Sequence, residues 1–191
     1  MAETTTTTPR LTRPVFLLGM MGAGKSRVGR ELADMSEAVF IDLDRRIERM
    51  FGRSIPTLFE LGEAYFRACE RSALLSLCDE PGFAGANAVV ATGGGIVVER
   101  ANLDTMGVGD RVYLEVGVET LVARLSAPAE RRDRPLLGDD PDALGERLRA
   151  LLGSREQHYR SADHCVSGEP EARTVAVAIL ERLAERKTIL P

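Results

Sequence analysis

The chain has few of the residues that most often hold metals or form disulfide frameworks. Its 191 residues include three cysteines and two histidines. Cys69, Cys78 and Cys165 lack the spacing of metal ligands, and an odd number of cysteines argues against a disulfide framework. Neither His158 nor His164 has a cysteine or a second histidine at ligand spacing. We therefore expect the cysteines to be buried apolar residues, and we assign neither histidine a catalytic role.

The chain also lacks long apolar runs and an excess of positive charge. No run approaches the length of a membrane span, and the N-terminus has no apolar core of a signal peptide. The net charge of −4 argues against a broad nucleic-acid-binding surface. The length allows one domain with a real core. We expect a cytoplasmic, monomeric protein that binds neither membrane nor nucleic acid.

Short apolar runs alternate with amphipathic segments along most of the chain. Residues 1–13 contain five consecutive threonines followed by Pro9, which predicts a disordered tail, and residues 187–191 are expected as a C-terminal tail. Between them, residues 14–186 are expected to form a single domain. Five runs are expected as strands: 15–18, 38–44, 88–91, 111–116 and 164–166. Helical segments separate them, so we predict an α/β fold, a five-stranded parallel sheet with helices on both faces.

Residues 19–26 match the pattern G-x-x-x-x-G-K-[ST], the phosphate loop of nucleoside-triphosphate-binding proteins. An apolar run precedes the loop, and a helix is expected from Lys25 to about Met35. Glycines let backbone N–H groups turn toward phosphates, and the helix N-terminus adds partial positive charge. Lys25 would contact the β- and γ-phosphates, and Ser26 would ligate Mg²⁺. The residues expected around the phosphates are Gly22, Ala23, Gly24, Lys25 and Ser26.

Residues that could bind Mg²⁺ or a substrate also follow two other expected strands. Asp42 and Asp44 lie two residues apart at the end of one strand, so we expect them on the same side. One carboxylate can serve Mg²⁺ and the other can accept a proton from an attacking hydroxyl. The alternatives are a solvated acidic turn, or Asp44 as a helix cap. Residues 93–95 are three glycines and resemble a second backbone cradle, with a flexible loop as the alternative. Because ligands bind at the carboxyl ends of parallel strands, we expect these segments and the phosphate loop to share one crevice.

Two arginines and one irregular segment complete the candidate features. Arg67 precedes Glu70 by three residues, and without other information both Arg67 and Arg155 are better explained as surface ion pairs. Residues 126–141 contain three prolines and a dense charge cluster, and they interrupt the regular pattern. This segment therefore stands apart from the alternating strands and helices on either side of it.

Together these segments resemble the shikimate kinases, a family of P-loop small-molecule kinases. The resemblance extends from about Val15 to Leu183. The phosphate loop alone occurs in many NTPases, but the full set in this order and spacing is specific. The set comprises Gly19 to Ser26, Asp42-Leu43-Asp44, Gly52-Arg53-Ser54-Ile55, Leu61-Gly62-Glu63, Phe66-Arg67, Thr92 to Gly95, Arg134-Pro135-Leu136-Leu137, Arg155 and Tyr159-Arg160.

The resemblance implies transfer of the ATP γ-phosphate to the 3-hydroxyl of shikimate, on the route to chorismate and the aromatic amino acids. It also implies the three-layer P-loop kinase fold, with a substrate-binding segment at about 44–79 and a mobile lid at about 126–141. Asp44 would bind the shikimate hydroxyls and is the candidate base, while Asp42 and Ser26 would serve Mg²⁺.

The same resemblance implies roles for the arginines and glycines. Arg67 and Arg155 would bind the shikimate carboxylate, consistent with the planar fork that arginine offers a carboxylate. The other implied roles are for Gly93, Gly94 and Gly95 in lining the shikimate pocket, Arg134 in contacting the transferred phosphate from the lid, and Arg124 in stacking on adenine. Arg27 stands where the family commonly has threonine, and we expect it among the nucleotide-binding residues. Lys25, Asp44 and Arg134 are thus the expected catalytic residues.

Three alternatives remain open at this point. A gluconate or nucleoside monophosphate kinase of the same fold is disfavoured by Asp42-Leu43-Asp44 together with the glycine triplet. A GTPase switch is disfavoured because no Asn-Lys-x-Asp segment for reading guanine occurs. An inactive homologue that serves as a scaffold is disfavoured by the intact set of Lys25, Ser26, Asp42, Asp44 and Arg67.

Overall fold

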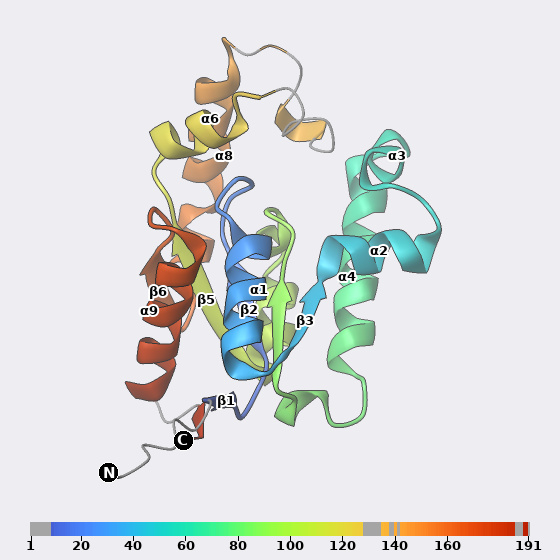
Figure 1. Cartoon of the computed structure of the whole chain (residues 1–191). Helices are drawn as coiled ribbons and strands as arrows, with labels where there is room; N and C mark the ends of the chain where they lie inside the picture. The colour runs from blue at the N-terminus through green and yellow to red at the C-terminus, as the bar shows by residue number, and fades with distance from the viewer. Residues whose placement is uncertain (1–8, 128–134, 138–139, 141, 186–188, 191) are drawn as a thin grey trace, which may run out of the picture.

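Five parallel strands form the centre of the molecule (Figure 1). The computed structural model describes residues 9–127, 135–137, 140, 142–185 and 189–190, so Arg134 and much of the expected lid lie outside it. In spatial order the strands are β3 (Val39–Asp42), β4 (Ala88–Ala91), β2 (Val15–Leu18), β5 (Asp110–Glu115) and β6 (His164–Ser167). The predicted α/β fold with a five-stranded parallel sheet is therefore confirmed.

The sequence of the central strands explains their position. β2 and β4 consist only of apolar residues, and all of them are buried. Such uniformly apolar runs suit strands that are covered on both faces. β2 pairs with both β4 and β5, so the phosphate loop that follows it begins in the middle of the sheet.

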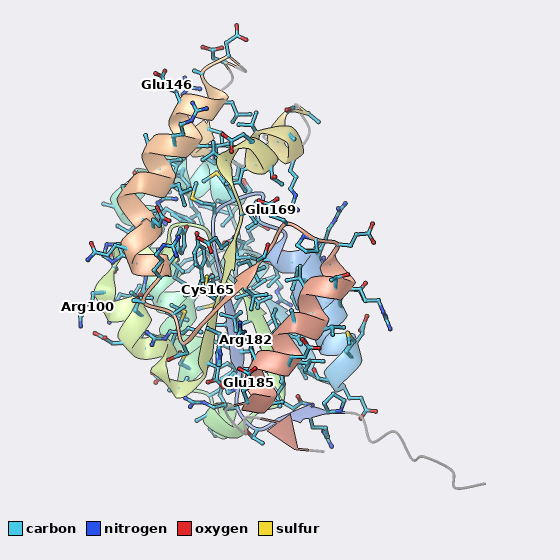
Figure 2. The ribbon with its side chains drawn as sticks, turned by 90° about the vertical axis from the view of Figure 1, so that its left-hand side faces the viewer. Arg100, Glu146, Cys165, Glu169, Arg182 and Glu185 are labelled. Carbon is cyan, nitrogen blue, oxygen red and sulfur yellow. The ribbon has the colours of Figure 1, made fainter. Side chains whose placement is uncertain are left out.

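Helices cover both faces of the sheet. Figure 2 shows the two layers, with Arg100 of α5 (Arg100–Thr105) and Glu146 of α8 (Leu144–Tyr159) on one side and Arg182 of α9 (Ala172–Glu185) on the other. Helix α1 (Lys25–Ser36) packs beside α9, and α4 (Glu63–Cys78) packs beside α5. The close approach of α1 to the sheet requires Gly29, because a Cβ there would lie 2.6 Å from the Phe40 ring.

Two short helices extend the molecule beyond the β3 edge, where they pack with α4 (Figure 1). They are α2 (Leu43–Phe51) and α3 (Ile55–Glu60). Ser54 caps α3, its side chain accepting a hydrogen bond from the Thr57 N–H at 3.4 Å. The other described helical elements are α6 (Val118–Leu125) and the 3₁₀ turns η1 (Phe83–Gly85), η2 (Ile96–Val98), η3 (Met106–Val108) and η4 (Pro135–Leu137).

The start of α2 shows that the expected strand over residues 38–44 is too long, which changes the prediction for Asp42 and Asp44. Strand β3 ends at Asp42, and the Asp42 carboxylate accepts a hydrogen bond from the Arg45 N–H at 3.2 Å. This cap starts α2 at Leu43, so Asp44 lies in the first helical turn and not on the strand. The two carboxylates therefore do not share a side through strand alternation.

The ends of the described chain also differ from expectation. Arg10–Leu11 forms strand β1, which pairs antiparallel with β7 (Ile189–Leu190). Leu11 is buried, and its N–H donates to the Asn87 side chain at 3.1 Å. The expected tails over 1–13 and 187–191 thus contain a paired segment, held by packing and backbone hydrogen bonds.

The cysteines occupy three different environments. Cys69 is buried as expected and Cys78 is partly buried, but Cys165 is exposed. The expectation is wrong for Cys165 because β6 is an edge strand whose residues alternate between buried and exposed positions. Within the described ranges no helix is long and apolar enough to cross a bilayer.

Candidate active site

The phosphate loop joins the carboxyl end of β2 to the N-terminus of α1. Gly19, Gly22 and Gly24 have φ values of +142°, +81° and +92°, a region that residues with a Cβ rarely adopt. A Cβ on Gly22 would also lie 2.9 Å from Leu125. The local sequence therefore shapes a loop that ends at a helix N-terminus, where the backbone favours an anion.

Lys25 is held inside this loop. Its side chain is largely buried, and the ammonium group donates hydrogen bonds to the carbonyl oxygens of Gly19 at 2.7 Å and Met20 at 2.9 Å. The structure therefore places a positive charge within the loop that the motif assigned to phosphate. Arg27, two residues further along α1, is exposed.

Ser26 and Asp42 meet beside the loop. The Ser26 hydroxyl donates to Asp42 Oδ2 at 3.0 Å, which joins the first turn of α1 to the end of β3. A hydroxyl and a carboxylate are the oxygen donors that Mg²⁺ prefers, so these residues fit the ion that phosphate-loop enzymes use. In the part of the chain that the structure covers, no three His, Cys, Asp or Glu residues gather as a metal cluster.

The glycine triplet lies against the carboxylates of two helices. A Cβ on Gly93 would lie 3.1 Å from Asp44 Oδ1 and 2.7 Å from Glu70 Oε1. A Cβ on Gly94 would lie 3.1 Å from the backbone nitrogen of Met21 in the phosphate loop. Asp44, the triplet and the phosphate loop thus converge, as expected from their place at the carboxyl ends of the strands.

Arg67 forms one ion pair with the buried Glu70 and one with the exposed Glu63, so the surface ion-pair alternative accounts for the second pair only. It donates to Glu70 at 2.8 Å and to Glu63 at 3.0 Å, with its side chain only 11% exposed. Its guanidinium carbon lies 5.2 Å from the centre of the Phe66 ring. Any side chain at position 95 would collide with the Arg67 guanidinium, so the glycine there allows the arginine to lie over the cradle.

Sequence reasoning did not assign Glu70 to the site. Its carboxylate is 1% exposed, and burial raises its pKa to about 7 from an ordinary value of 4.5. The positive charge of Arg67 opposes this rise, the negative charge of Asp44 adds to it, and Arg155 lowers it. The available signal was the three-residue spacing from Arg67, which is equally common in surface ion pairs.

Arg155 approaches the triplet from α8 on the opposite side. It is 4% exposed, so the surface ion-pair alternative is wrong for this residue. Its guanidinium donates to the Gly94 carbonyl at 3.3 Å, and the Tyr159 hydroxyl donates to the same carbonyl. Two arginines from different helices therefore lie against one glycine cradle.

Arg124 links the phosphate loop to the segment between β6 and α9. It donates to the Gly168 and Glu169 carbonyls at 3.0 and 3.1 Å, and it lies 3.4 Å from the Gly22 and Ala23 carbonyls. In Figure 2, Glu169 lies above Cys165 and well below Glu146. Arg124 is thus beside the nucleotide loop, whereas Arg134 lies outside the described residues.

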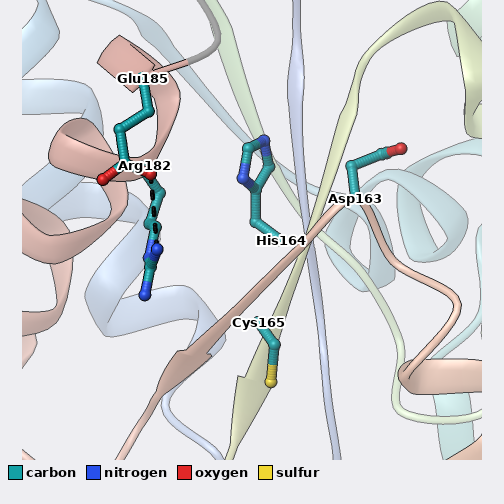
Figure 3. A pocket seen from close by; sticks show the side chains of 5 residues that line it. All are labelled: Asp163, His164, Cys165, Arg182 and Glu185. Carbon is teal, nitrogen blue, oxygen red and sulfur yellow. Dashed lines mark hydrogen bonds and ion pairs between the residues drawn. The ribbon is translucent and has the colours of Figure 1, made fainter.

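A separate hollow of about 330 Å³ lies between β6 and α9. Figure 3 shows its lining residues, Asp163, His164, Cys165, Arg182 and Glu185. The Asp163 carboxylate accepts two hydrogen bonds from the Arg111 side chain, at 3.0 and 3.2 Å. The hollow lies at the amino end of β6, so it is separate from the cradle at the carboxyl ends.

Comparison with known proteins identifies the family. A family model described as shikimate kinase matches residues 21–184. The chain belongs to the shikimate kinase family. Its activity is that of this family, ATP-dependent phosphoryl transfer to a hydroxyl of shikimate. The family uses ATP and typically Mg²⁺.

Individual shikimate kinases resemble the chain over nearly its whole length. The shikimate kinase of Halorhodospira halophila is 44% identical over 88% of this chain and 92% of its own. That of Pseudoalteromonas atlantica is 40% identical over 90% of this chain and 96% of its own. The structure of the Acinetobacter baumannii shikimate kinase in complex with shikimate is 35% identical, with a TM-score of 0.82 over 92% of this chain and 94% of that one.

A gluconokinase structure from Sinorhizobium meliloti shares the fold at 19% identity, with a TM-score of 0.59 over 93% of this chain and 97% of that one. This likeness extends to the fold alone, so the gluconate kinase alternative receives no support from it.

Proposed function

We propose that this shikimate kinase binds the carboxylate of shikimate between Arg67 and Arg155, over the backbone of residues 93–95. One observation carries the proposal: the buried Arg155 of α8 and the mostly buried Arg67 of α4 lie against neighbouring glycines of one cradle. Burying arginines is costly unless they are paired, and a planar fork suits a carboxylate. Arg67 already holds Glu63 and Glu70, so its remaining donors would serve the ligand.

We assign the acceptor hydroxyl to Asp44. Its carboxylate is next to Gly93 and therefore beside the cradle that would hold the shikimate ring. From there it would bind ring hydroxyls and accept the proton of the 3-hydroxyl as that oxygen attacks the γ-phosphate. Because the cradle also packs against Met21 of the phosphate loop, the acceptor would lie next to the transferred group.

The nucleotide half of the site would consist of the phosphate loop and α1. Backbone groups of Gly22, Ala23 and Gly24 would surround the phosphates, and Lys25 would turn from the Gly19 and Met20 carbonyls to the β- and γ-phosphate oxygens. Ser26 and Asp42 would hold Mg²⁺, which neutralises phosphate charge when bound. We further assign Arg124 to the adenine ring, and Arg27 and Arg134 to the phosphates.

An ADP-release assay with shikimate, gluconate and nucleoside monophosphates side by side tests the substrate assignment. Shikimate alone should support turnover. A charge-assisted hydrogen bond contributes about 1.5–3 kcal/mol, so Arg67→Ala and Arg155→Ala should each raise the KM for shikimate about 10- to 150-fold. The KM for ATP should barely change in either variant.

Arg173→Ala provides the matched control, because Arg173 is an exposed arginine that pairs with Glu31 on the surface. It should leave both KM values unchanged. Normal shikimate kinetics in both cradle variants would refute the carboxylate assignment.

We also propose, from the sequence, a monomeric cytoplasmic enzyme without nucleic-acid or membrane partners. Size-exclusion chromatography with light scattering tests the oligomeric state.

A further inference from the structure

Tyr159 lies where the nucleotide and acceptor halves of the site meet. It is the last residue of α8, about one helical turn after Arg155, and it is fully buried. Its ring stacks on Tyr113 of β5 with centroids 5.0 Å apart and an angle of 9° between the planes. Tyr113 in turn pairs with Leu18, the last residue before the phosphate loop. The Tyr159 ring is therefore fixed by the sheet itself.

The Tyr159 hydroxyl contacts both halves of the site. It donates a hydrogen bond to the Gly94 carbonyl in the acceptor cradle, and it lies 3.6 Å from Met20 Sδ in the phosphate loop. Burial keeps the pKa of this phenol above its usual range, while the charge of Arg155 and a hydrogen bond from Arg155 to the phenol act in the opposite direction. The hydroxyl thus stays a neutral donor at any pH at which the enzyme would work.

A purely structural role does not explain a hydroxyl at this position. Stacking on Tyr113 needs only an aromatic ring, which phenylalanine would supply without a polar group to satisfy. Burying a hydroxyl is unfavourable unless it forms a hydrogen bond, and here the partner belongs to the site. The same Gly94 carbonyl also accepts from Arg155 at 3.3 Å. Its oxygen therefore joins Tyr159 to an arginine of the carboxylate site.

We propose that Tyr159 is a positioning residue for the acceptor cradle, in that its hydroxyl fixes the Gly94 carbonyl against which Arg155 is aligned. The Arg155 bond to this carbonyl is long, at 3.3 Å, so while Tyr159 also donates to the oxygen the guanidinium can turn its fork toward a carboxylate. Without the hydroxyl, Arg155 becomes the principal donor to that oxygen and is drawn away from the ligand. The inference rests on the proposed function, because it takes Arg155 to bind the carboxylate of shikimate.

Tyr159→Phe tests the proposal, with Tyr113→Phe as the matched control. The first variant removes the hydroxyl at the cradle and keeps the stacked rings, while the second removes the hydroxyl of the other ring. Losing one hydrogen bond of ordinary strength should raise the KM for shikimate about 3- to 10-fold in Tyr159→Phe. The KM for ATP should stay within about twofold of the wild type. Tyr113→Phe should keep the wild-type KM for shikimate.

A double-mutant cycle with Arg155→Ala separates this role from general packing. If Tyr159 acts through Arg155, Tyr159→Phe should cause little further loss of shikimate affinity in the Arg155→Ala background. An unchanged KM for shikimate in Tyr159→Phe overturns the proposal. So does a parallel rise of both KM values with a lowered Tm, or a full additional loss in the double variant. A wild-type KM for shikimate in the single variant Arg155→Ala would instead reject the proposed function, the binding of the carboxylate by that arginine.

Discussion

Removing the Arg67 guanidinium should leave a carboxylate buried without its closest cation. Arg67 lies 2.8 Å from Glu70, whose side chain is 1% exposed. Breaking a buried pair from one side costs about 3–5 kcal/mol, because the remaining charge is unsolvated. We therefore expect Arg67→Ala to lower the free energy of unfolding by about that amount under alkaline conditions, in addition to its effect on shikimate binding.

The dependence of this loss on pH identifies its cause. Burial raises the pKa of Glu70 from 4.5 to about 7, and Arg67 limits the rise, so the pKa should rise further in Arg67→Ala. A carboxyl group whose pKa is higher in the folded protein than in the unfolded chain stabilises the fold when it is protonated. This stabilisation is complete at pH values below the unfolded-state pKa, and it is lost as the pH rises through the folded-state pKa. In the wild type this stabilisation by protonated Glu70 is nearly lost by about pH 7. In Arg67→Ala the free energy of unfolding should continue to fall above pH 7, by up to about 1.4 kcal/mol per pH unit.

Urea unfolding between pH 7 and pH 9 measures this difference. Wild type, Arg67→Ala and the double variant Arg67→Ala/Glu70→Gln should be compared, because glutamine removes the titrating group. We expect a falling free energy of unfolding for the single variant and a flat one for the double, which should recover part of the stability at pH 9. The KM for shikimate should remain high in both. Parallel curves for the single and double variants would refute the buried-charge reasoning.

Three further predictions concern other parts of the site. Lys25→Ala should abolish phosphoryl transfer without changing the melting curve, and near-normal turnover would contradict the phosphate-loop assignment. Asp44→Asn should lower kcat by about 10²- to 10⁴-fold, whereas Asp42→Asn should shift the Mg²⁺ concentration that the enzyme requires. If the two variants respond identically to a Mg²⁺ titration, the assignment of separate roles to Asp42 and Asp44 is wrong. Gly95→Ala should displace Arg67, because the added Cβ collides with its guanidinium. The KM for shikimate should then rise at least about 10-fold while the KM for ATP stays constant, and unchanged kinetics would contradict this geometry.

The fold was predictable because its signals are local. The apolar runs of β2 and β4 and the phosphate loop between β2 and α1 specify buried strands and a helix start without reference to distant residues. Where one residue type could serve two local structures, the prediction failed. Asp42 ends a strand and also caps a helix, and a single hydrogen bond to the Arg45 N–H decides where α2 begins.

The candidate site was less accessible from sequence, because burial is decided by packing between distant segments. Arg67 and Arg155 have the pattern of surface ion pairs, and only the family resemblance assigned them to one ligand. Glu70 carried no signal of its own, and Tyr159 belonged to the family motif without an assigned role, since their importance comes from Arg67 and Gly94 beside them. The roles of individual residues, and the lid with Arg134, stay predictions that the proposed variants can test.

The pairing of β1 with β7 has a consequence for building chimeric enzymes. Arg10 is the register partner of Leu190, and both ends leave the molecule at the opposite side from the phosphate loop (Figure 1). A host protein could therefore accept this domain as an insertion into one of its surface turns, with entry and exit points a single strand spacing apart. Such a graft would leave the crevice facing outward, and a short peptide joining the same two ends would give a cyclic or circularly permuted kinase.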